Sequence, residues 1–308
     1  MVYTYFLYAS VMMSMGLGGL IARDKGSEEV WVERPEQERK IRCLKAGEGP
    51  TTLLFVAGWC INGDFWQAQM QAFQENYTVV AVDLPGFGKS VSGQGNWTIS
   101  EYADDLLAVI NALKLKNVIL IGHSMSGDVV LEAAVRDPQA IKGVIGIDTF
   151  KFVGEQPTPE MMAGFQVFLE NLKTDFQTTA LAYAQNSLFH LSTPQAVQEQ
   201  VLESIRNTDP EAGYVSLANL FQYMAMEEGG ALGKLSFPLN LINSDALPTA
   251  TGGLEASCAN GFRLLEIPAT GHYPMLEKPE AFNQLLAEAL KGITADKTKQ
   301  NREEHLVH

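Results

Sequence analysis

The sequence predicts an α/β fold: a doubly wound, mostly parallel sheet with a helical cap inserted between two strands. Three observations point to it. Short uncharged runs rich in Val, Ile and Leu recur along the chain, as in strands covered on both faces. Segments with helical spacing alternate with these runs, and small residues cluster where several runs end. Ligands bind at the carboxyl ends of the strands in such sheets, so these small-residue turns are candidate functional sites.

The elements of the core are expected in residues 28–150 and 236–293. Residues 28–44 predict one or two edge strands, and Thr98-Ile99-Ser100-Glu101 is a capping box that opens a helix. A polar tail is expected over residues 294–308. Strands are predicted at 52–56, 77–82, 118–121, 141–147, 238–243 and 262–267, and helices at 65–73, 98–113, 128–136 and 279–293.

The strand pattern stops between residues 151 and 235. This segment has helical spacing and many aromatic side chains, and the strands resume after it. It therefore reads as a helical cap inserted into one sheet, and not as a separate domain.

Residues 1–22 carry no charge and are followed by Arg23. Their length is close to the roughly 20 residues that span a bilayer. We read them as an apolar signal or anchor segment, and we favour a membrane-anchored or exported protein over a cytoplasmic one. The alternative is an N-terminal helix packed on a cytoplasmic enzyme.

The composition narrows the function classes. The chain has 308 residues, of which 46% are hydrophobic, and a formal net charge of −14, so a nucleic-acid partner is not expected. The three cysteines are widely spaced, which predicts neither a disulfide framework nor a metal site. The five histidines lack metal-ligand spacing, and no cofactor is expected.

The most informative stretch is Gly122-His123-Ser124-Met125-Ser126. It follows a buried strand and precedes a helix, and small residues stand two before and two after Ser124. A strand-to-helix turn of this kind is a nucleophile elbow, in which the serine needs a base and donors for the developing oxyanion. Taken alone, the stretch could equally be a tight turn without chemistry.

Four motifs together resemble the α/β-hydrolase superfamily. They are FVAGW (55–59), DLPGFGKS (83–90), GHSMSG (122–127) and GHYPMLEKPEAF (271–282), and they occur in the order of that family. The resemblance implies that Ser124 is the nucleophile and His272 the general base. His123 is the rival base, for which a structural role is expected, and His190 is expected in a pocket wall.

The resemblance also implies two oxyanion donors. They are the backbone N–H groups of Met125, after the nucleophile, and of Trp59, after the glycine of the family's usual His-Gly pair. Ala57 stands where that histidine is usual, and Ser126 stands where the glycine of GxSxG is usual.

The acid is open between two aspartates. Relatives usually carry it after the strand that follows the cap, where this chain has Leu247, with Asp245 two residues earlier. Some relatives, including certain haloalkane dehalogenases, carry it at the end of the strand before the cap, where Asp148 stands. We favour Asp148 over Asp245.

The resemblance implies a serine hydrolase that cleaves a small-molecule carboxylic ester with an apolar acyl or aryl group through an acyl-enzyme. Two alternatives stay open: C–C hydrolase or perhydrolase chemistry on the same residues, and a hydrolase-fold ligand receptor with slow turnover. A dehalogenase is disfavoured because it would need an aspartate at position 124. Any membrane association would run through residues 1–22.

Overall fold

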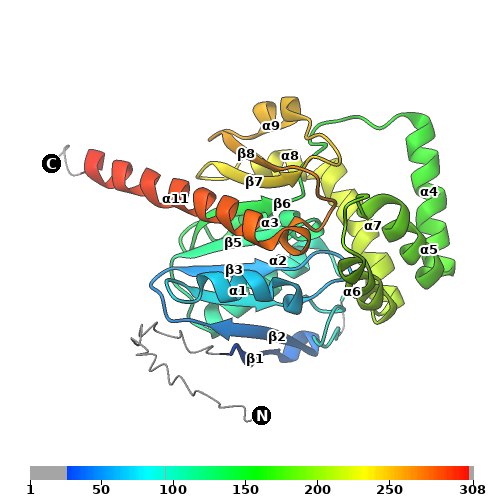
Figure 1. Ribbon diagram of the computed structural model, residues 1–308, viewed down its shortest axis with the longest axis horizontal. Coiled ribbons are helices and arrows are strands. Elements are labelled where there is room, and N and C mark those ends of the chain that lie inside the picture. The colour runs from blue at the N-terminus through cyan, green and yellow to red at the C-terminus, as the bar shows by residue number, and fades with distance from the viewer. Residues whose placement is uncertain (1–25, 94, 305–308) are drawn as a thin grey trace, which may run out of the picture.

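The computed structural model describes residues 26–93 and 95–304, with only the backbone for residues 294–304. Its centre is an eight-stranded sheet in the order β1-β2-β4-β3-β5-β6-β7-β8 (Figure 1). The strands are β1 (Glu28–Arg34), β2 (Arg39–Ala46), β3 (Thr52–Val56), β4 (Thr78–Val82), β5 (Val118–His123), β6 (Ile141–Ile147), β7 (Leu239–Ser244) and β8 (Phe262–Ile267).

Strand β2 pairs antiparallel with both of its neighbours, and the pairs from β4 to β8 are parallel. The predicted doubly wound, mostly parallel sheet is therefore confirmed. Strands β3 and β5 are buried at every residue, which explains their continuous apolar sequence.

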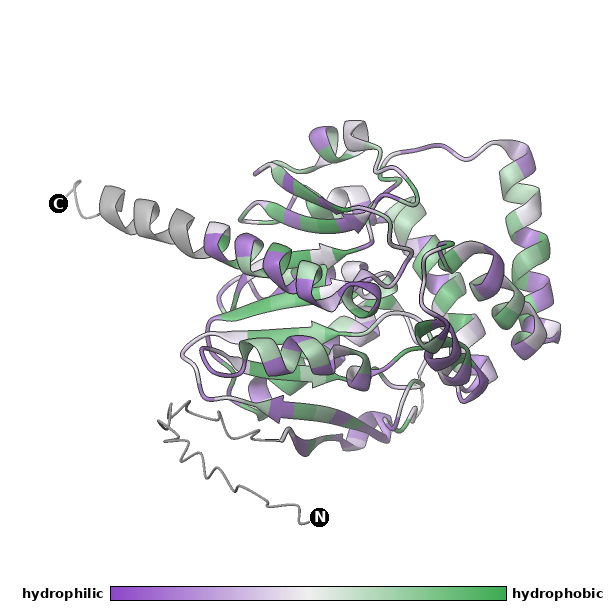
Figure 2. Cartoon of the chain, viewed as in Figure 1, coloured by the Kyte–Doolittle hydropathy of each residue, from purple (hydrophilic) through white to green (hydrophobic). Residues whose placement is uncertain are grey.

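Helices cover both faces of the sheet. Helices α1 (Gln67–Phe73) and α11 (Pro279–Glu304) lie on one face, and α2 (Ile99–Ala112) and α3 (Met125–Arg136) pack together on the other (Figure 1). The hydropathy colouring shows largely hydrophobic central strands, flanked by helices in which hydrophilic and hydrophobic residues alternate (Figure 2). Thr98 caps α2 by accepting a hydrogen bond from the Glu101 N–H, as the capping box predicts.

A helical segment connects β6 to β7. Its helices α7 and α8 pack on α3, and α4 and α5 lie farther from the sheet (Figure 1). The segment consists of α4 (Pro159–Thr174), α5 (Phe176–Tyr183), the π-helical turn η3 (Ala184–Leu188), α6 (Gln195–Arg206), α7 (Pro210–Met226) and α8 (Glu228–Leu232).

The expected helix end at Ile293 is wrong, because α11 continues to Glu304. Two short helices, α9 (Thr251–Ser257) and α10 (Pro274–Glu277), were not predicted, nor were the 3-10 turns η1 (Pro35–Gln37) and η2 (Gly63–Trp66). The proposed signal or anchor segment, residues 1–22, lies outside the described residues. No helix within the described ranges has the length and apolar character to span a membrane.

Candidate active site

Ser124 occupies a sharp turn between β5 and α3. Its φ of 52° and ψ of −124° are unfavourable for a residue with a side chain, which is typical of strain held at a functional position. Gly122 makes the turn possible, because a Cβ there would stand 2.2 Å from the Ser126 carbonyl oxygen. The turn leaves Ser124 facing the pocket described below.

Ser126 connects this turn to the loop after β3. Its side chain is fully buried, and its hydroxyl donates a 2.5 Å hydrogen bond to the Ala57 carbonyl. The loop passes so close to the turn that a Cβ at Gly58 would lie 3.1 Å from Ser124 Cβ. The loop that carries Trp59 is therefore fixed against the turn that carries Ser124.

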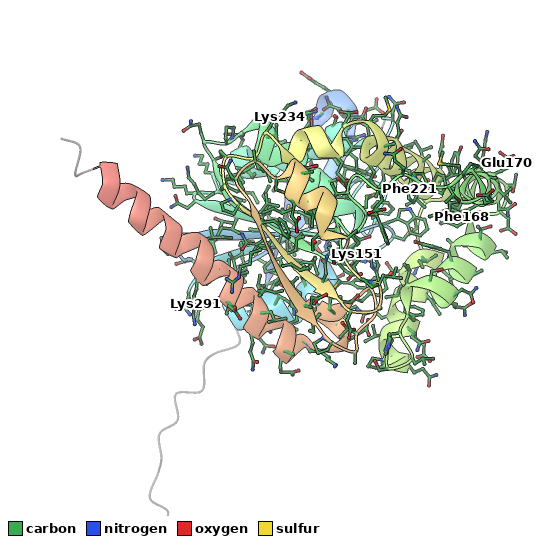
Figure 3. All side chains as sticks on the ribbon, turned by 90° about the horizontal axis from the view of Figure 1, so that it is seen from above. Lys151, Phe168, Glu170, Phe221, Lys234 and Lys291 are labelled. Atoms are coloured by element: carbon green, nitrogen blue, oxygen red, sulfur yellow. The ribbon has the colours of Figure 1, made fainter. Side chains whose placement is uncertain are left out.

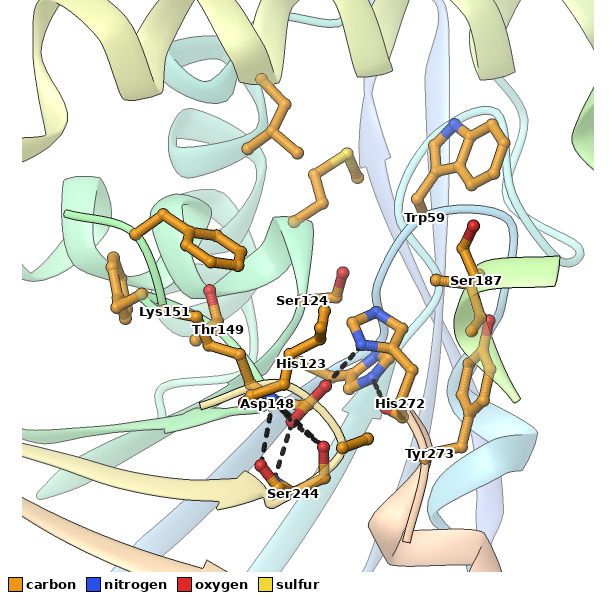
Figure 4. A pocket seen from close by; sticks show the side chains of 18 of the residues that line it. Trp59, His123, Ser124, Asp148, Thr149, Lys151, Ser187, Ser244, His272 and Tyr273 are labelled. Atoms are coloured by element: carbon orange, nitrogen blue, oxygen red, sulfur yellow. Dashed lines mark hydrogen bonds and ion pairs between the residues drawn. The ribbon is translucent and has the colours of Figure 1, made fainter. Parts of the chain in front are cut away.

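His272 and Asp148 form a hydrogen-bonded pair. His272 Nδ1 lies 2.7 Å from Asp148 Oδ2 (Figure 4). A carboxylate only accepts hydrogen bonds, so the ring carries a proton on Nδ1 and leaves Nε2 free to act as a base. No hydrogen bond joins this ring to the Ser124 hydroxyl within the described part of the chain; such bonds often tighten only when substrate binds.

The other oxygen of Asp148 has three donors. Oδ1 accepts from the Ser244 backbone N–H at 2.8 Å, from the Ser244 hydroxyl at 2.7 Å, and from Lys151 Nζ at 2.7 Å. Burial would raise the pKa of Asp148, but the hydrogen bond and charge of His272, together with the charge of Lys151, outweigh burial and hold this pKa well below its usual range. Asp148 is thus an ionised carboxylate in a buried position.

Asp245, the alternative acid, is an exposed residue in the loop that follows β7. Its carboxylate accepts a hydrogen bond from the Ala269 N–H at 2.8 Å. The structure brings Asp148 to His272, and it does not bring Asp245 there.

His123 is buried beside this pair. Its Nε2 lies 2.7 Å from the His272 carbonyl oxygen, so Nε2 carries the proton and donates. Burial and the neighbouring His272 lower the pKa of His123 to about 3, which keeps the ring neutral. His123 contacts the backbone of His272 and is placed to support it. His190, expected in a pocket wall, is absent from the pocket lining and bonds Ser192 instead.

The two expected oxyanion donors flank the pocket. Trp59 and Met125 both line it, and neither backbone N–H donates to another described residue. Met125 is the first residue of α3, so its N–H points out of the helix start. The Trp59 indole N–H donates to the Gly213 carbonyl at 2.7 Å and so connects this loop to α7.

Ser124, Asp148 and His272 line a single pocket of about 260 Å³. Among the residues whose side chains are described, no group of three or more His, Cys, Asp or Glu is placed to hold a metal ion. The lining is mainly apolar, and much of it comes from the segment between β6 and β7: Phe152, Tyr183, Leu188, Phe189, Leu217, Leu220, Phe221 and Met224.

Comparison with known proteins identifies the family. The sequence pattern of the alpha/beta hydrolase fold matches residues 51–212, more than half of the chain. The chain is an α/β hydrolase.

Relatives of this α/β hydrolase include enzymes named for ester cleavage. The pimeloyl-[acyl-carrier protein] methyl ester esterase of Yersinia enterocolitica is 28% identical over 79% of this chain and 94% of its own. A thermophilic esterase from Thermogutta terrifontis has a TM-score of 0.72 at 24% identity, over 86% of this chain and 99% of that one. A bromoperoxidase from Bacillus anthracis has a TM-score of 0.74 at 19% identity, over 86% and 100%. These solved structures show the shared α/β-hydrolase fold.

Two contributors to this α/β-hydrolase site were missed from the sequence. Ser244 and Lys151 both contact Asp148, and both lie outside the motifs that carry the family resemblance. Lys151 could have been noticed, because it is a single charge three residues after a candidate acid in an apolar, aromatic context. Ser244 carries no comparable signal, since it reads as an ordinary strand end.

Proposed function

We propose that this α/β hydrolase is a serine esterase that cleaves small carboxylic esters through an acyl-enzyme. The observation that carries the proposal is the 2.7 Å hydrogen bond between Asp148 and His272 in a pocket that also holds Ser124 at a strained turn. A nucleophile, a base and an acid, on the turns that follow β5, β8 and β6, are the components of acyl transfer by a serine.

In the acylation step, Ser124 Oγ attacks the ester carbonyl carbon while His272 Nε2 removes the hydroxyl proton. Asp148 stabilises the imidazolium that forms and holds the ring in the required tautomer. The carbonyl oxygen becomes an oxyanion, which the N–H groups of Trp59 and Met125 stabilise. His272 then returns the proton to the alkoxide, and the alcohol leaves.

In the deacylation step, water takes the place of the alcohol. His272 removes a proton from the water, whose oxygen attacks the acyl carbon. The second tetrahedral intermediate collapses, Ser124 recovers its proton from His272, and the carboxylic acid leaves. The same donors serve both steps because the oxyanion forms in the same position.

The pocket favours a modest apolar group in the substrate. A volume of about 260 Å³ with an apolar wall suits a short or medium acyl chain or an aryl group. The relatives support ester cleavage, since several are named pimeloyl-[acyl-carrier protein] methyl ester esterases, although the proposal for this chain extends only to small esters.

The test is hydrolysis of p-nitrophenyl esters from acetate to octanoate by the wild type and single variants. We expect Ser124→Ala to lower kcat by at least about a thousandfold, and Asp148→Asn by a similar factor, because each removes one member of the triad. Asp245→Asn is the matched control and should stay near the wild-type rate. Circular dichroism checks that each variant folds.

Three outcomes would contradict the proposal or a part of it. Activity that survives Ser124→Ala would mean that another group performs the chemistry. Loss of activity in Asp245→Asn with retention in Asp148→Asn would reassign the acid. A wild type without turnover on any ester would bring forward receptor action or perhydrolysis.

A further inference from the structure

Lys151 is a buried cation at the centre of the candidate site. Its side chain is 7% exposed, and Figure 3 shows it in the interior of the projection, whereas the exposed Lys234 and Lys291 lie toward the outline. A buried lysine requires partners, because an unpaired charge away from water is strongly unfavourable. The identity of those partners indicates its role.

All the acceptors around Lys151 Nζ belong to the acid and the loop beside it. Asp148 Oδ1 lies at 2.7 Å, the carbonyl and hydroxyl oxygens of Ser244 both at 3.1 Å, and the Leu247 carbonyl at 3.0 Å. An ammonium has three N–H donors, and these four acceptors use them all. Lys151 therefore has no donor to spare for a substrate, although it lies in the pocket wall.

These contacts fix two segments to each other. Lys151 begins the segment that follows β6, and Leu247 lies in the loop that follows β7. The backbone adds a further contact, because the Lys151 carbonyl accepts a hydrogen bond from the Ala250 N–H at 2.9 Å. Asp148, which follows β6, is thus held in place by contacts from the loop that follows the neighbouring strand β7.

We propose that Lys151 is a positioning residue of this hydrolase, which orients Asp148 toward His272 and sets the pH below which His272 stops acting as a base. The inference rests on the proposed function of the triad. It concerns a residue that touches neither the substrate nor the reacting atoms.

The effect on pH follows from charge. The Lys151 ammonium and the His272 imidazolium contact opposite oxygens of one carboxylate, so they repel each other. The other titratable groups near this cluster are His123, which is neutral, and Asp128, Tyr183 and Tyr273, for each of which burial raises the pKa and favours the neutral form. The Glu277 carboxylate, which accepts hydrogen bonds from the Gly271 and Tyr273 N–H groups, carries the opposite charge to Lys151. Lys151 is therefore the charge that opposes protonation of His272. Its removal should make His272 easier to protonate and should extend the inactive, protonated form to higher pH.

The test compares the full chain with Lys151→Met and Lys151→Gln, which remove the charge, and Lys151→Arg, which keeps it. The readout is kcat/KM for p-nitrophenyl butyrate from pH 4 to 9. We expect the acid limb of the kcat/KM profile to move upward by about one pH unit in both neutral variants. Part of the kcat/KM that these variants lose at pH 6 should therefore recover at pH 8.5. Lys151→Arg should keep the limb at the wild-type position.

Ser244→Ala is the matched control, because it removes a contact to Asp148 that carries no charge. It removes a neutral hydrogen bond from the same carboxylate oxygen, so we expect a lower rate with a much smaller shift of the limb. NMR titration of the His272 ring in the wild type and the neutral variants gives the same comparison without turnover.

A uniform loss of rate with an unmoved acid limb and an unmoved NMR titration would assign Lys151 a purely structural role and overturn the inference. Failure of both neutral variants to fold, with Lys151→Arg folded, would do the same. A wild type inactive on every ester would refute the proposed function, and the NMR titration would still decide the effect of Lys151.

Discussion

Two positions that depart from the family pattern contact each other. The chain has Ala57 where relatives carry the histidine of a His-Gly pair, and Ser126 where the elbow usually has glycine. The Ser126 hydroxyl donates to the Ala57 carbonyl, one residue before Gly58 and two before Trp59. The hydroxyl at one position therefore supports the loop that has lost its usual side chain at the other.

We expect Ser126→Ala and Ser126→Gly to lower kcat for p-nitrophenyl esters by about tenfold with little change in KM. A whole oxyanion donor is worth a hundred- to a thousandfold, and here the Trp59 N–H is displaced without being removed. Ser90→Ala is the matched control, because the buried Ser90 hydroxyl also donates to a backbone carbonyl, that of Asp83, outside the pocket lining. An unchanged kcat in both Ser126 variants would show that the loop holds its position without this bond.

The role of a single residue could be predicted where a short sequence motif around it indicates that role. Ser124 and His272 stand in motifs that can be recognised from a few neighbours. The acid could not be decided in this way, because Asp148 and Asp245 both follow strands and only the three-dimensional structure shows which one lies near His272. The role of Lys151 depends on a carbonyl 96 residues away, which no local pattern reveals.

Helices α3 and α8 are joined by two buried carboxyl groups. Asp128 on α3 and Glu228 on α8 are 2% and 3% exposed, and their carboxyl groups lie close enough to interact. Burial, with the proximity of Glu228, raises the pKa of Asp128 well above its usual range, and burial raises the pKa of Glu228 to about 7. The folded pair therefore retains a proton that the unfolded chain releases at lower pH.

The sign of the linkage follows from these directions. Because the folded pair binds more protons, its contribution to the free energy of unfolding is greatest below the unfolded pKa values of 3.8 and 4.5 and falls as the pH rises toward 7 and above. Asp128→Asn removes one titrating group and supplies an amide donor to Glu228. We expect the variant to gain stability relative to wild type between pH 5 and pH 8, by at most about 1.4 kcal/mol per pH unit for each proton concerned.

Urea unfolding at pH 5, 6.5 and 8 measures this difference. Asp104→Asn is the control, because its carboxylate on α2 is 53% exposed, and this variant should follow the wild-type curve. A difference between Asp128→Asn and wild type that does not vary with pH would contradict the shared proton.

Whole elements were predictable where burial imposed a continuous pattern. The bounds predicted for β3 and β6 agree with the structure, because these strands are mostly buried apolar runs bounded by turns. The bounds of β8 also agree, although this strand is mostly half-buried and carries Arg263 and Glu266. Helix α9 was missed because its seven residues, TGGLEAS, include two glycines and are too short for a helical period. The extension of α11 was missed because residues 294–304 lack an apolar stripe, although their alanine, lysine, glutamine, arginine and glutamate residues favour helix.

At the scale of the molecule, the winding of the sheet assembles the site. Trp59 follows β3, Ser124 follows β5, Asp148 follows β6 and His272 follows β8, so all four lie at the carboxyl edge of parallel strands. This convergence is a property of the α/β class and was predictable from the alternation of strands and helices. The packing of the segment between β6 and β7 was not, because helices with mixed faces can dock in several ways.

The apolar segment at residues 1–22 stays a prediction, and it can be tested independently of catalysis. We expect the full chain to sediment with membranes after expression, and a chain of residues 24–308 to stay in the supernatant at the same kcat, since β1 begins only at Glu28. Immunoblots of the two fractions give the result. Equal partitioning of both chains would refute a membrane role for residues 1–22, and a loss of kcat on truncation would favour a packing role.

The position of Asp148 has a consequence for how this protein can change. With the carboxylate partner of His272 after β6, the side chains of residues 246–248 have no part in the proposed chemistry, and Lys151 contacts this stretch through the backbone carbonyl of Leu247. Asp245 and Thr249, which flank it, hold the loop by side-chain hydrogen bonds. Almost any residue can supply that carbonyl. Residues 246–248 are therefore free to diversify, and because Ala246 and Leu247 line the pocket, libraries randomised there should yield new substrate preferences with few inactive variants.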